Sequence, residues 1–350
     1  MLRTVRRCAW VGFALLGVGT SPVRAEDAGE KFRAGIAAKV QALEKNNAAA
    51  LAGPDGWLFV TAELRTMAAG RFWGTDASKV SRSPKPENAD PLPAILDFNQ
   101  QLKDRGVTLI VVPVPPKSEV YPEKVAADLP APSGDPAPAL AGFYEELRRG
   151  GVDVLDLAPA FRANKASEHG PVFCRTDTHW SGVGCVLAAK LIAEKIEAKF
   201  PAFAEPGMTN PLAVVEWKEV AIDGDLGGML EASVKKPGAE KIAVRQLRTA
   251  VAPDPNSPVL LLGDSHALVF HDFLAERAGL LDQLAVELGT VPDRIAVRGS
   301  GATAVRIDLY RRSVREPGYL AKKKVVVWCF TAREFTEAAQ GWQKVPVAKP

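Results

Sequence analysis

One short segment of the sequence contains an acid and a base at a spacing that suits proton transfer. Within residues 174–181, a single residue separates Asp177 from His179. If this segment is extended, side chains at positions i and i+2 point to the same side, so the carboxylate adjoins the imidazole. Such a carboxylate fixes the tautomer of the ring and stabilises the imidazolium that forms on proton uptake. The alternative is a structural histidine in a turn, with Asp177 or Ser181 capping the next helix.

A second segment offers a hydroxyl nucleophile at the end of an apolar run. Residues 260–262 are leucines, and Gly263-Asp264-Ser265 follows them directly. In open parallel sheets, ligands bind at the carboxyl ends of strands, which places Ser265 where chemistry is expected. A helix beginning there would add backbone N–H groups and a dipole that favour an oxyanion. Alternatively, Ser265 or Asp264 only caps that helix.

Together the two segments indicate catalysis more strongly than either does alone. A serine hydroxyl is a weak nucleophile that needs a base, and the base benefits from an orienting acid. The chain has four histidines, and His179 combines an aspartate two residues earlier with a predicted strand–helix junction. His266 and His271 are rivals for the base, but His266 adjoins Ser265 in sequence and His271 lies more than one helical turn away. His169 lies in a polar loop.

The remaining cysteine and histidine patterns favour neither a thiol nucleophile nor a metal centre. Beyond the N-terminal segment the cysteines are Cys174, Cys185 and Cys329. A disulfide between Cys174 and Cys185 would bracket the Asp177–His179 segment in an oxidising compartment, and three buried thiols are the alternative. No histidine is spaced from a cysteine as paired metal ligands are. We therefore expect no metal and no cofactor.

Apolar runs and amphipathic stretches alternate along most of the 350 residues, which are 47% hydrophobic and can bury a full core. Continuous apolar runs are expected of strands buried on both faces of a parallel sheet; these are residues 107–112, 152–157, 259–262, 294–297 and 325–330. Helices are predicted at 93–105, 136–149, 181–200, 266–279 and 302–312. The alternation predicts a three-layer α/β sandwich with a mainly parallel central sheet. Residues 201–257 break it, with strands near 214–222 and 242–247, and are interpreted as an insertion.

The first 25 residues predict a cleaved secretion signal, with a frayed N-terminal helix as the alternative. Arginines precede a short apolar run at residues 8–20, and Ala25 ends a region of small residues. That run is too short to cross a bilayer core of roughly 30 Å, so no membrane anchor is expected after cleavage. Cleavage removes four arginines and no acids, so the formal charge falls from +3 to −1, and nothing points to nucleic acid. The Lys322–Lys324 run is expected to be solvated.

The motifs and their order resemble one known family. Gly263-Asp264-Ser265 is similar to the first signature block of SGNH hydrolases, but here the Asp177-Thr178-His179-Trp180 motif precedes the serine. That order resembles the AlgX/AlgJ group of SGNH hydrolase-like proteins, which act in O-acetylation of alginate and related exopolysaccharides. Similar motifs also occur at residues 55–59, at 112–117 with Tyr121, and at 327–330 with Arg333. A departure is His266, because the group often has an aromatic residue after the serine.

The resemblance implies an SGNH-type fold with circularly shifted motif order over residues 53–335, between a lead-in at 26–52 and a tail at 336–350. It implies a catalytic triad of Asp177, His179 and Ser265 in a periplasmic O-acetyltransferase. A polysaccharide would be the substrate, and a membrane-bound O-acyltransferase the acetyl supplier. The same triad suits an acetyl esterase, and a non-catalytic scaffold or polysaccharide-binding subunit of an export complex is a further alternative. Candidate substrate-binding residues, which can equally be core or surface residues, are Lys117, Tyr121, Trp180, Arg298 and Arg333.

Overall fold

The structure, a computed structural model, describes residues 22–132, 134–203 and 215–349. The predicted secretion signal lies almost entirely outside these ranges. Within them, no helix combines the length and apolar character needed to cross a membrane.

Five parallel strands form the central sheet in the order β4-β3-β9-β7-β8. The middle strands are apolar on both faces and nearly all their residues are buried, as expected where helices cover both sides of a sheet. The five apolar runs expected as strands all lie in this sheet. The strands are β3 (Thr108–Val114), β4 (Asp153–Val154), β7 (Val259–Gly263), β8 (Asp293–Ala296) and β9 (Val325–Thr331).

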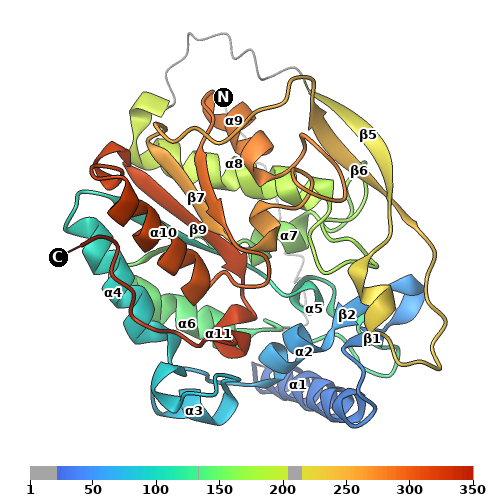
Figure 1. Ribbon diagram of the computed structural model, residues 1–350. Helices are drawn as coiled ribbons and strands as arrows, with labels where there is room; N and C mark the ends of the chain where they lie inside the picture. The colour runs from blue at the N-terminus through green and yellow to red at the C-terminus, as the bar shows by residue number, and fades with distance from the viewer. Residues whose placement is uncertain (1–21, 133, 204–214, 350) are drawn as a thin grey trace, which may run out of the picture.

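Helices cover both faces of the sheet (Figure 1). One layer contains α4 (Pro91–Lys103), α6 (Pro138–Arg149) and α10 (Thr303–Arg315). The other contains α7 (Ala158–Ala163), α8 (Gly182–Lys199) and α9 (Leu280–Leu288). Strand β9 shows the two sides of the sheet, because its Trp328 packs on Phe98 of α4 with ring centroids 5.1 Å apart, while the thiol of the next residue, Cys329, interacts with Cys185 of α8. The predicted three-layer α/β sandwich is confirmed.

Helix starts follow capping rules that the sequence carries. Ser181 caps α8, because its Oγ accepts hydrogen bonds from the amides of Val183 at 3.1 Å and Gly184 at 3.4 Å. Asp90 caps α4 through the Leu92 amide at 3.0 Å, and Pro91 occupies the first helical position. These caps fix where each helix leaves the loop before it, and for α8 that loop is the Asp177–His179 segment.

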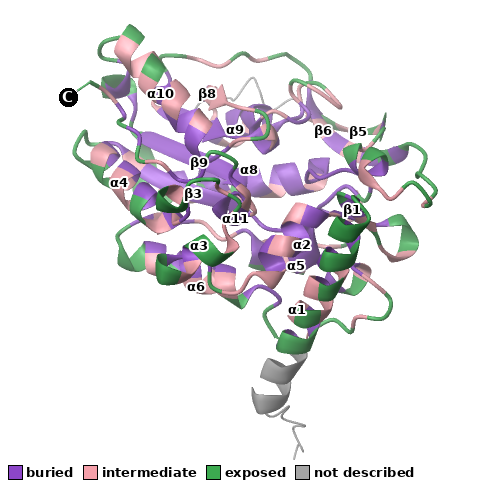
Figure 2. Ribbon diagram, turned by 60° about the horizontal axis from the view of Figure 1, so that its bottom comes forward, coloured by how far each residue is buried: buried purple, intermediate pink, exposed green. Residues whose placement is uncertain are grey.

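The N-terminal part packs beside the carboxyl ends of the strands. Helix α1 (Pro22–Lys45) lies against α2 (Thr61–Ala68), with its outer side exposed (Figure 2). Between them β1 (Ala50–Ala52) and β2 (Leu58–Val60) form an antiparallel hairpin. The Leu58 amide donates to the carbonyl of Arg175 at 2.8 Å, so this hairpin joins the Asp177–His179 segment. The short helices here are α3 (Ala77–Val80), α5 (Lys117–Val120) and α11 (Glu334–Glu337).

The strands predicted within residues 201–257 form an antiparallel ribbon of β5 (Val215–Ile222) and β6 (Glu240–Leu247). The ribbon lies directly on the start of α8, where a β-carbon on Gly182 would be 2.3 Å from the carbonyl oxygen of Ala243. Between its strands, residues 223–239 extend toward the Asp177–His179 segment.

The helix predicted at 266–279 is wrong. After Ser265 the chain forms only a 3-10 turn, η8 (Ser265–Ala267), and α9 begins at Leu280. Phe270, Leu274 and Arg277 have positive φ angles of 65°, 64° and 55°, which no right-handed helix accommodates. The amide of Phe270 bonds back to the carbonyl of Phe273, so the segment folds on itself.

Candidate active site

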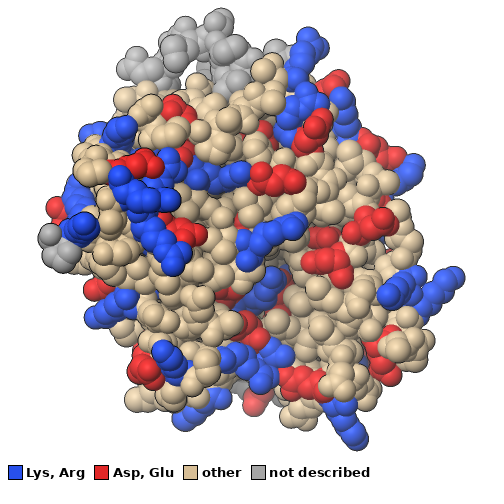
Figure 3. All heavy atoms as spheres, viewed as in Figure 1, with Lys and Arg blue, Asp and Glu red and all other residues tan. Residues whose placement is uncertain are grey.

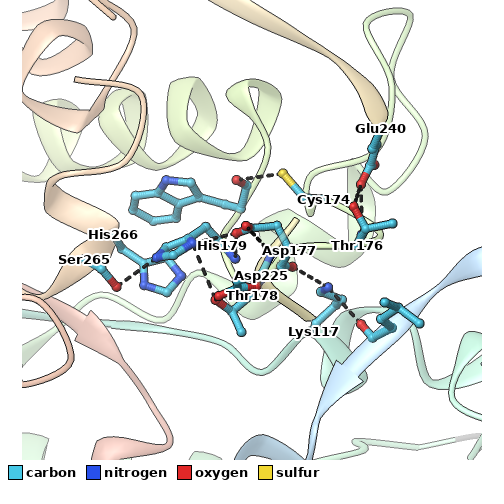
Figure 4. A network of polar contacts seen from close by, with 12 residues as sticks. Lys117, Cys174, Thr176, Asp177, Thr178, His179, Asp225, Glu240, Ser265 and His266 are labelled. Atoms are coloured by element: carbon cyan, nitrogen blue, oxygen red, sulfur yellow. Dashed lines mark hydrogen bonds and ion pairs between the residues drawn. The ribbon is translucent and has the colours of Figure 1, made fainter. Parts of the chain in front are cut away.

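Three side chains from distant parts of the chain form one continuous line of hydrogen bonds (Figure 4). Ser265 Oγ lies 2.8 Å from Nε2 of His179, and Nδ1 of His179 lies 2.6 Å from Oδ1 of Asp177. Asp177 and His179 are buried, whereas Ser265 is half-buried. With Asp177 ionised, Nδ1–H donates to the carboxylate and Nε2 is left to accept the serine proton. This geometry can activate a hydroxyl nucleophile.

The turn after β7 positions Ser265. A β-carbon on Gly263 would lie 2.4 Å from the carbonyl oxygen of Cys329 on β9, so the strand end packs only as glycine. Asp264 then holds the turn, because Oδ1 accepts the His266 amide at 2.8 Å and Oδ2 accepts the Thr331 amide at 2.8 Å. The capping role that the sequence allowed to Asp264 or Ser265 is therefore filled by Asp264, which leaves the Ser265 hydroxyl directed at His179.

A buried lysine fixes the backbone of the Asp177–His179 segment. Nζ of Lys117 donates to the carbonyls of Asp177 at 2.6 Å, Leu58 at 2.9 Å and Arg175 at 3.4 Å. These three bonds use all three ammonium protons. Burial lowers the pKa of Lys117, while nearby acids, Glu63 first, oppose that shift. Lys117 is therefore not placed to contact substrate as predicted, because its side chain is 1% exposed and all three ammonium protons are donated to backbone carbonyls.

Two acids that the sequence analysis missed hold the same segment from the side of the β5–β6 ribbon. Asp225 accepts the amide of Thr178 at 2.8 Å and its hydroxyl at 2.6 Å. Glu240 accepts the amides of Arg175 at 2.9 Å and Thr176 at 2.8 Å. Gly224 permits the approach, since a β-carbon there would lie 2.2 Å from the Thr176 carbonyl oxygen. For Asp225 the available signal was an acid beside Gly224 in a loop, which is too common to single out, and nothing in the sequence distinguishes Glu240 from other acids.

Asp177 is held as a carboxylate. Burial opposes its charge, but hydrogen bonds from the ring and amide of His179 and from the Asp225 amide outweigh burial and lower its pKa to about 2. The Asp225 amide donates to Oδ2 at 3.1 Å. An ionised Asp177 is the form that keeps the proton on Nδ1 of His179 and stabilises the imidazolium.

Asp177, His179 and Asp225 also bring possible metal-ligand atoms within 4.8 Å of one another. Their oxygens, however, already accept protein hydrogen bonds: those of Asp177 from His179 and the Asp225 amide, and those of Asp225 from Thr178. These hydrogen bonds explain why the three side chains lie close together, and the same bonds support the Ser265–His179–Asp177 line.

Of the five candidate substrate-binding residues, Arg298 and Arg333 are the two that are not buried. The Arg298 guanidinium stacks 3.9 Å from the ring centroid of Phe273, whose ring is 5.5 Å from that of His179. Arg298 is exposed, so it stands at the rim of the site. Arg333 follows β9 and pairs with Glu63 at 2.9 Å. Both could meet an anionic ligand, and Arg298 has the freer guanidinium.

Tyr121 and Trp180 are buried in the fold, which does not fit their predicted contact with sugar. The Tyr121 hydroxyl donates to the Lys165 carbonyl at 2.9 Å and accepts the Val172 amide at 3.0 Å. Trp180 is fully buried, and its ring packs edge-on against His266 at 5.0 Å. Both side chains shape the loops around the site from behind.

The sequence left open whether Cys174 and Cys185 form a disulfide or remain buried thiols, and the structure shows buried thiols. Cys174, Cys185 and Cys329 are buried and free. Cys174 Sγ lies 3.4 Å from the Trp180 carbonyl, and Cys185 Sγ lies 3.7 Å from that of Ala278. Burial raises the pKa of each thiol, so none is a ready thiolate. The Asp177–His179 segment is held by hydrogen bonds.

Residues 50–332 match the family described as SGNH hydrolase-like domain, acetyltransferase AlgX. Two curated relatives are named probable alginate O-acetylase AlgJ. The one from Pseudomonas aeruginosa is 30% identical over 144 residues, covering 41% of this chain and 32% of the relative. The one from Pseudomonas syringae pv. tomato is 29% identical over 154 residues, covering 44% and 35%. The matched stretch thus spans about a third of the length of these relatives.

Solved structures show the same likeness over more of the chain. The O-acetyltransferase domain of Pseudomonas putida AlgJ has a TM-score of 0.61 and 25% identity, and the match covers 83% of this chain and 92% of that one. Pseudomonas aeruginosa AlgX has a TM-score of 0.56 and 18% identity, covering 81% and 63%, which bears on the fold alone. The family resemblance predicted from the two motifs is confirmed.

Proposed function

The chain belongs to the SGNH hydrolase-like family described as acetyltransferase AlgX, and from this premise we propose that it is a periplasmic O-acetyltransferase that modifies an exopolysaccharide. The observation that carries the proposal is the Ser265–His179–Asp177 line, with 2.8 Å and 2.6 Å between its hydrogen-bonding atoms. These three residues would form the catalytic triad.

In the first step His179 takes the proton of Ser265 as Oγ attacks the carbonyl carbon of an acetyl donor. Asp177 stabilises the imidazolium, and backbone N–H groups including that of Ser265 hold the tetrahedral oxyanion. The intermediate then collapses, the bond to the donor's leaving group breaks, and His179 returns the proton to that group. The product is an acetyl ester on Ser265.

In the second step a sugar hydroxyl replaces the donor. His179 takes its proton, the sugar oxygen attacks the acetyl carbon, and the bond to Ser265 breaks with return of the proton to Oγ. Water in place of the sugar would give hydrolysis by the same atoms. Transfer therefore depends on how the acceptor is held.

Basic side chains support an anionic polymer as acceptor. An open groove of about 690 Å³ runs between β8 and α10 and is lined by Arg294, Arg311, Arg312 and Arg315, together with Asp308. Lys and Arg side chains gather over α10 on the face shown in Figure 3. An alginate-like polymer carries one carboxylate on each sugar, and Arg298 at the rim of the site could bind one of them. The groove runs along β8 toward the amino end of the sheet, where Arg312 pairs with Asp293 at 3.4 Å, so it would hold a part of the polymer away from Ser265. We propose that a membrane-bound O-acyltransferase supplies the acetyl group.

The test is Ser265→Ala, with Ser313→Ala on α10 as a matched control that removes a serine hydroxyl elsewhere. Both variants are assayed with a chromogenic acetyl ester, with and without a polyuronate acceptor, and the acetylated polymer is measured by mass spectrometry. We expect Ser265→Ala to lose at least about a thousandfold in rate and the control to retain activity. A serine-directed sulfonyl fluoride should label Ser265 alone.

Unchanged activity in Ser265→Ala would refute the proposal. Acetate release without acetylated polymer would replace transfer by hydrolysis. If the folded wild-type protein turned over neither substrate and the probe did not label it, the chain would instead be a non-catalytic scaffold or polysaccharide-binding subunit.

A further inference from the structure

A second aspartate–histidine pair lies directly beside the first. Asp264 and His266 repeat the spacing of Asp177 and His179. The His266 amide donates to Asp264 Oδ1 at 2.8 Å, and Nδ1 of the same residue lies 3.2 Å from that oxygen. With Asp264 ionised, the ring proton belongs on Nδ1, which leaves Nε2 as an unprotonated acceptor.

The His266 ring is enclosed between residues of the site. It is 1% exposed, and its centroid lies 4.9 Å from that of His179 and 5.0 Å from that of Trp180. Nε2 of His266 has no hydrogen-bond partner among the described residues. An apolar ring would pack here without burying an unpaired nitrogen, so a packing role alone does not account for a histidine.

The charged groups that face His266 come from three elements. Asp264 precedes it on the same turn, His179 faces it from the segment before α8 with Asp177 behind it, and Arg333 approaches from the loop before α11. Burial lowers the pKa of His266, and although Asp264 opposes this shift, His179 and Arg333 add to it. The folded protein therefore favours the neutral ring.

Asp264 itself stays ionised. Burial opposes its charge, but His266 and the amides of Thr331 and His266 outweigh burial and lower its pKa to about 2. A neutral His266 beside ionised Asp264 gives the pair a net charge of −1. That charge faces His179, which must become positive when it takes the Ser265 proton. Protonation of His266 would cancel the charge and set two cationic rings side by side.

We propose that Asp264 and His266 form a second pair that positions His179 and lends it negative charge, so that the site works only while His266 is neutral. His266 is a positioning residue in this scheme, because it acts on the base and touches neither substrate nor nucleophile. The inference rests on the proposed function of Ser265.

Two substitutions of His266 separate this role from packing. His266→Gln can still donate a side-chain N–H to Asp264, whereas His266→Phe fills the space but leaves Oδ1 one donor short. We expect kcat for acetyl-ester hydrolysis to fall about threefold in the glutamine variant and about thirtyfold in the phenylalanine variant. A role in packing alone gives the opposite order, because phenylalanine replaces the ring better, and that order would overturn the proposal.

The pH profile supplies a second readout. In the wild type two histidines must be neutral, so kcat/KM should fall by more than tenfold per pH unit at the acid end. In His266→Gln, kcat/KM should fall tenfold per pH unit, because only the protonation of His179 then removes activity. His271→Gln is the matched control, because His271 pairs with Asp282 at 2.8 Å on α9, and it should keep the steep profile. Equal slopes in wild type and His266→Gln would overturn the proposal.

The wild-type protein provides a test that needs no substitution at His266. The chain has four histidines, so ¹⁵N-histidine NMR can follow each ring through a pH titration. We expect His266 to remain the neutral Nδ1–H tautomer at every pH where the enzyme is fully active. A charged His266 at such a pH would overturn the inference, but the proposed function would stand as long as Ser265→Ala is inactive. Failure of the proposed function is distinct, because Ser265→Ala would then keep its activity.

Discussion

Polar groups are buried at both ends of the central sheet, but the two ends differ in how completely those groups are paired. At the amino end, Asp293 of β8 accepts Nζ of Lys323 at 2.9 Å and the Tyr319 hydroxyl at 2.5 Å. Lys323 also donates to the carbonyls of Pro255 at 3.0 Å and Ser257 at 2.9 Å. None of the polar side-chain atoms of Asp293 and Lys323 is left without a partner. This cluster has no free group with which to act.

At the carboxyl end some groups remain free. Ser265 is half-buried and can meet a ligand, and buried polar atoms of His266, Trp180 and Thr331 have no partner among the described residues. Incomplete pairing costs stability and is retained where a site must bind or react. The difference assigns stability to the amino end and chemistry to the carboxyl end, and each assignment can be broken by a substitution.

The largest effect is expected from Asp177→Asn. The amide keeps the shape of the side chain but removes the charge, so His179 loses the partner that fixes its tautomer and stabilises its imidazolium. We expect kcat for acetyl-ester hydrolysis to fall about 10³- to 10⁴-fold, with a smaller change in the free energy of unfolding. Steady-state kinetics and urea denaturation measure the two quantities. If Asp177→Asn instead lost much of its unfolding free energy while its folded fraction kept the wild-type kcat, the carboxyl end would serve stability and the assignment would be reversed.

At the amino end, Lys323→Met should give the opposite result. Removing the lysine leaves Asp293 charged and buried without its closest cation, which costs about 3–5 kcal/mol of unfolding free energy. The folded fraction should keep the wild-type kcat, because the cluster lies at the far end of the strands from Ser265. Urea denaturation followed by circular dichroism gives the stability, and kinetics at low temperature give the rate. A loss of kcat without a loss of stability would contradict the comparison.

The sequence carries much of this arrangement. Apolar runs located all five strands of the sheet, and the chemistry of serine, histidine and aspartate in two distant segments predicted which side chains meet. Where prediction failed, local pattern was overruled by contacts distant in sequence. Residues 266–279 form no helix, because positive φ angles and bonds within the loop fold that segment on itself.

Buried charge was the least predictable feature. The Lys322–Lys324 run was expected to be solvated, yet Lys323 is 2% exposed, because Asp293 and two carbonyls from elsewhere in the chain pair with it. Lys117 is buried for a similar reason. The Asp264–His266 spacing was visible in the sequence, but only the packing of the two histidine rings gives it meaning.

The smallest effect sharpens the comparison, because it tests whether the supports of the carboxyl end act on rate more than on stability. Asp225→Ala removes the acceptor of the Thr178 amide and hydroxyl, which hold the segment that carries His179. Outer-shell partners of this kind typically contribute about ten- to hundredfold to activity at metal sites, and we expect about tenfold in kcat here. Because Asp225 is exposed, unfolding free energy should fall by only about 1 kcal/mol.

Asp223→Ala is the matched control for this prediction. It removes an exposed carboxylate two residues away, so both variants change the net charge equally. Equal losses of kcat in the two variants would mean that Asp225 acts through general charge, and its hydrogen bonds to Thr178 would not matter. A tenfold loss confined to Asp225→Ala, with nearly wild-type denaturation, would show that the residues between β5 and β6 are part of the catalytic apparatus, because they hold the base at its distance from Ser265.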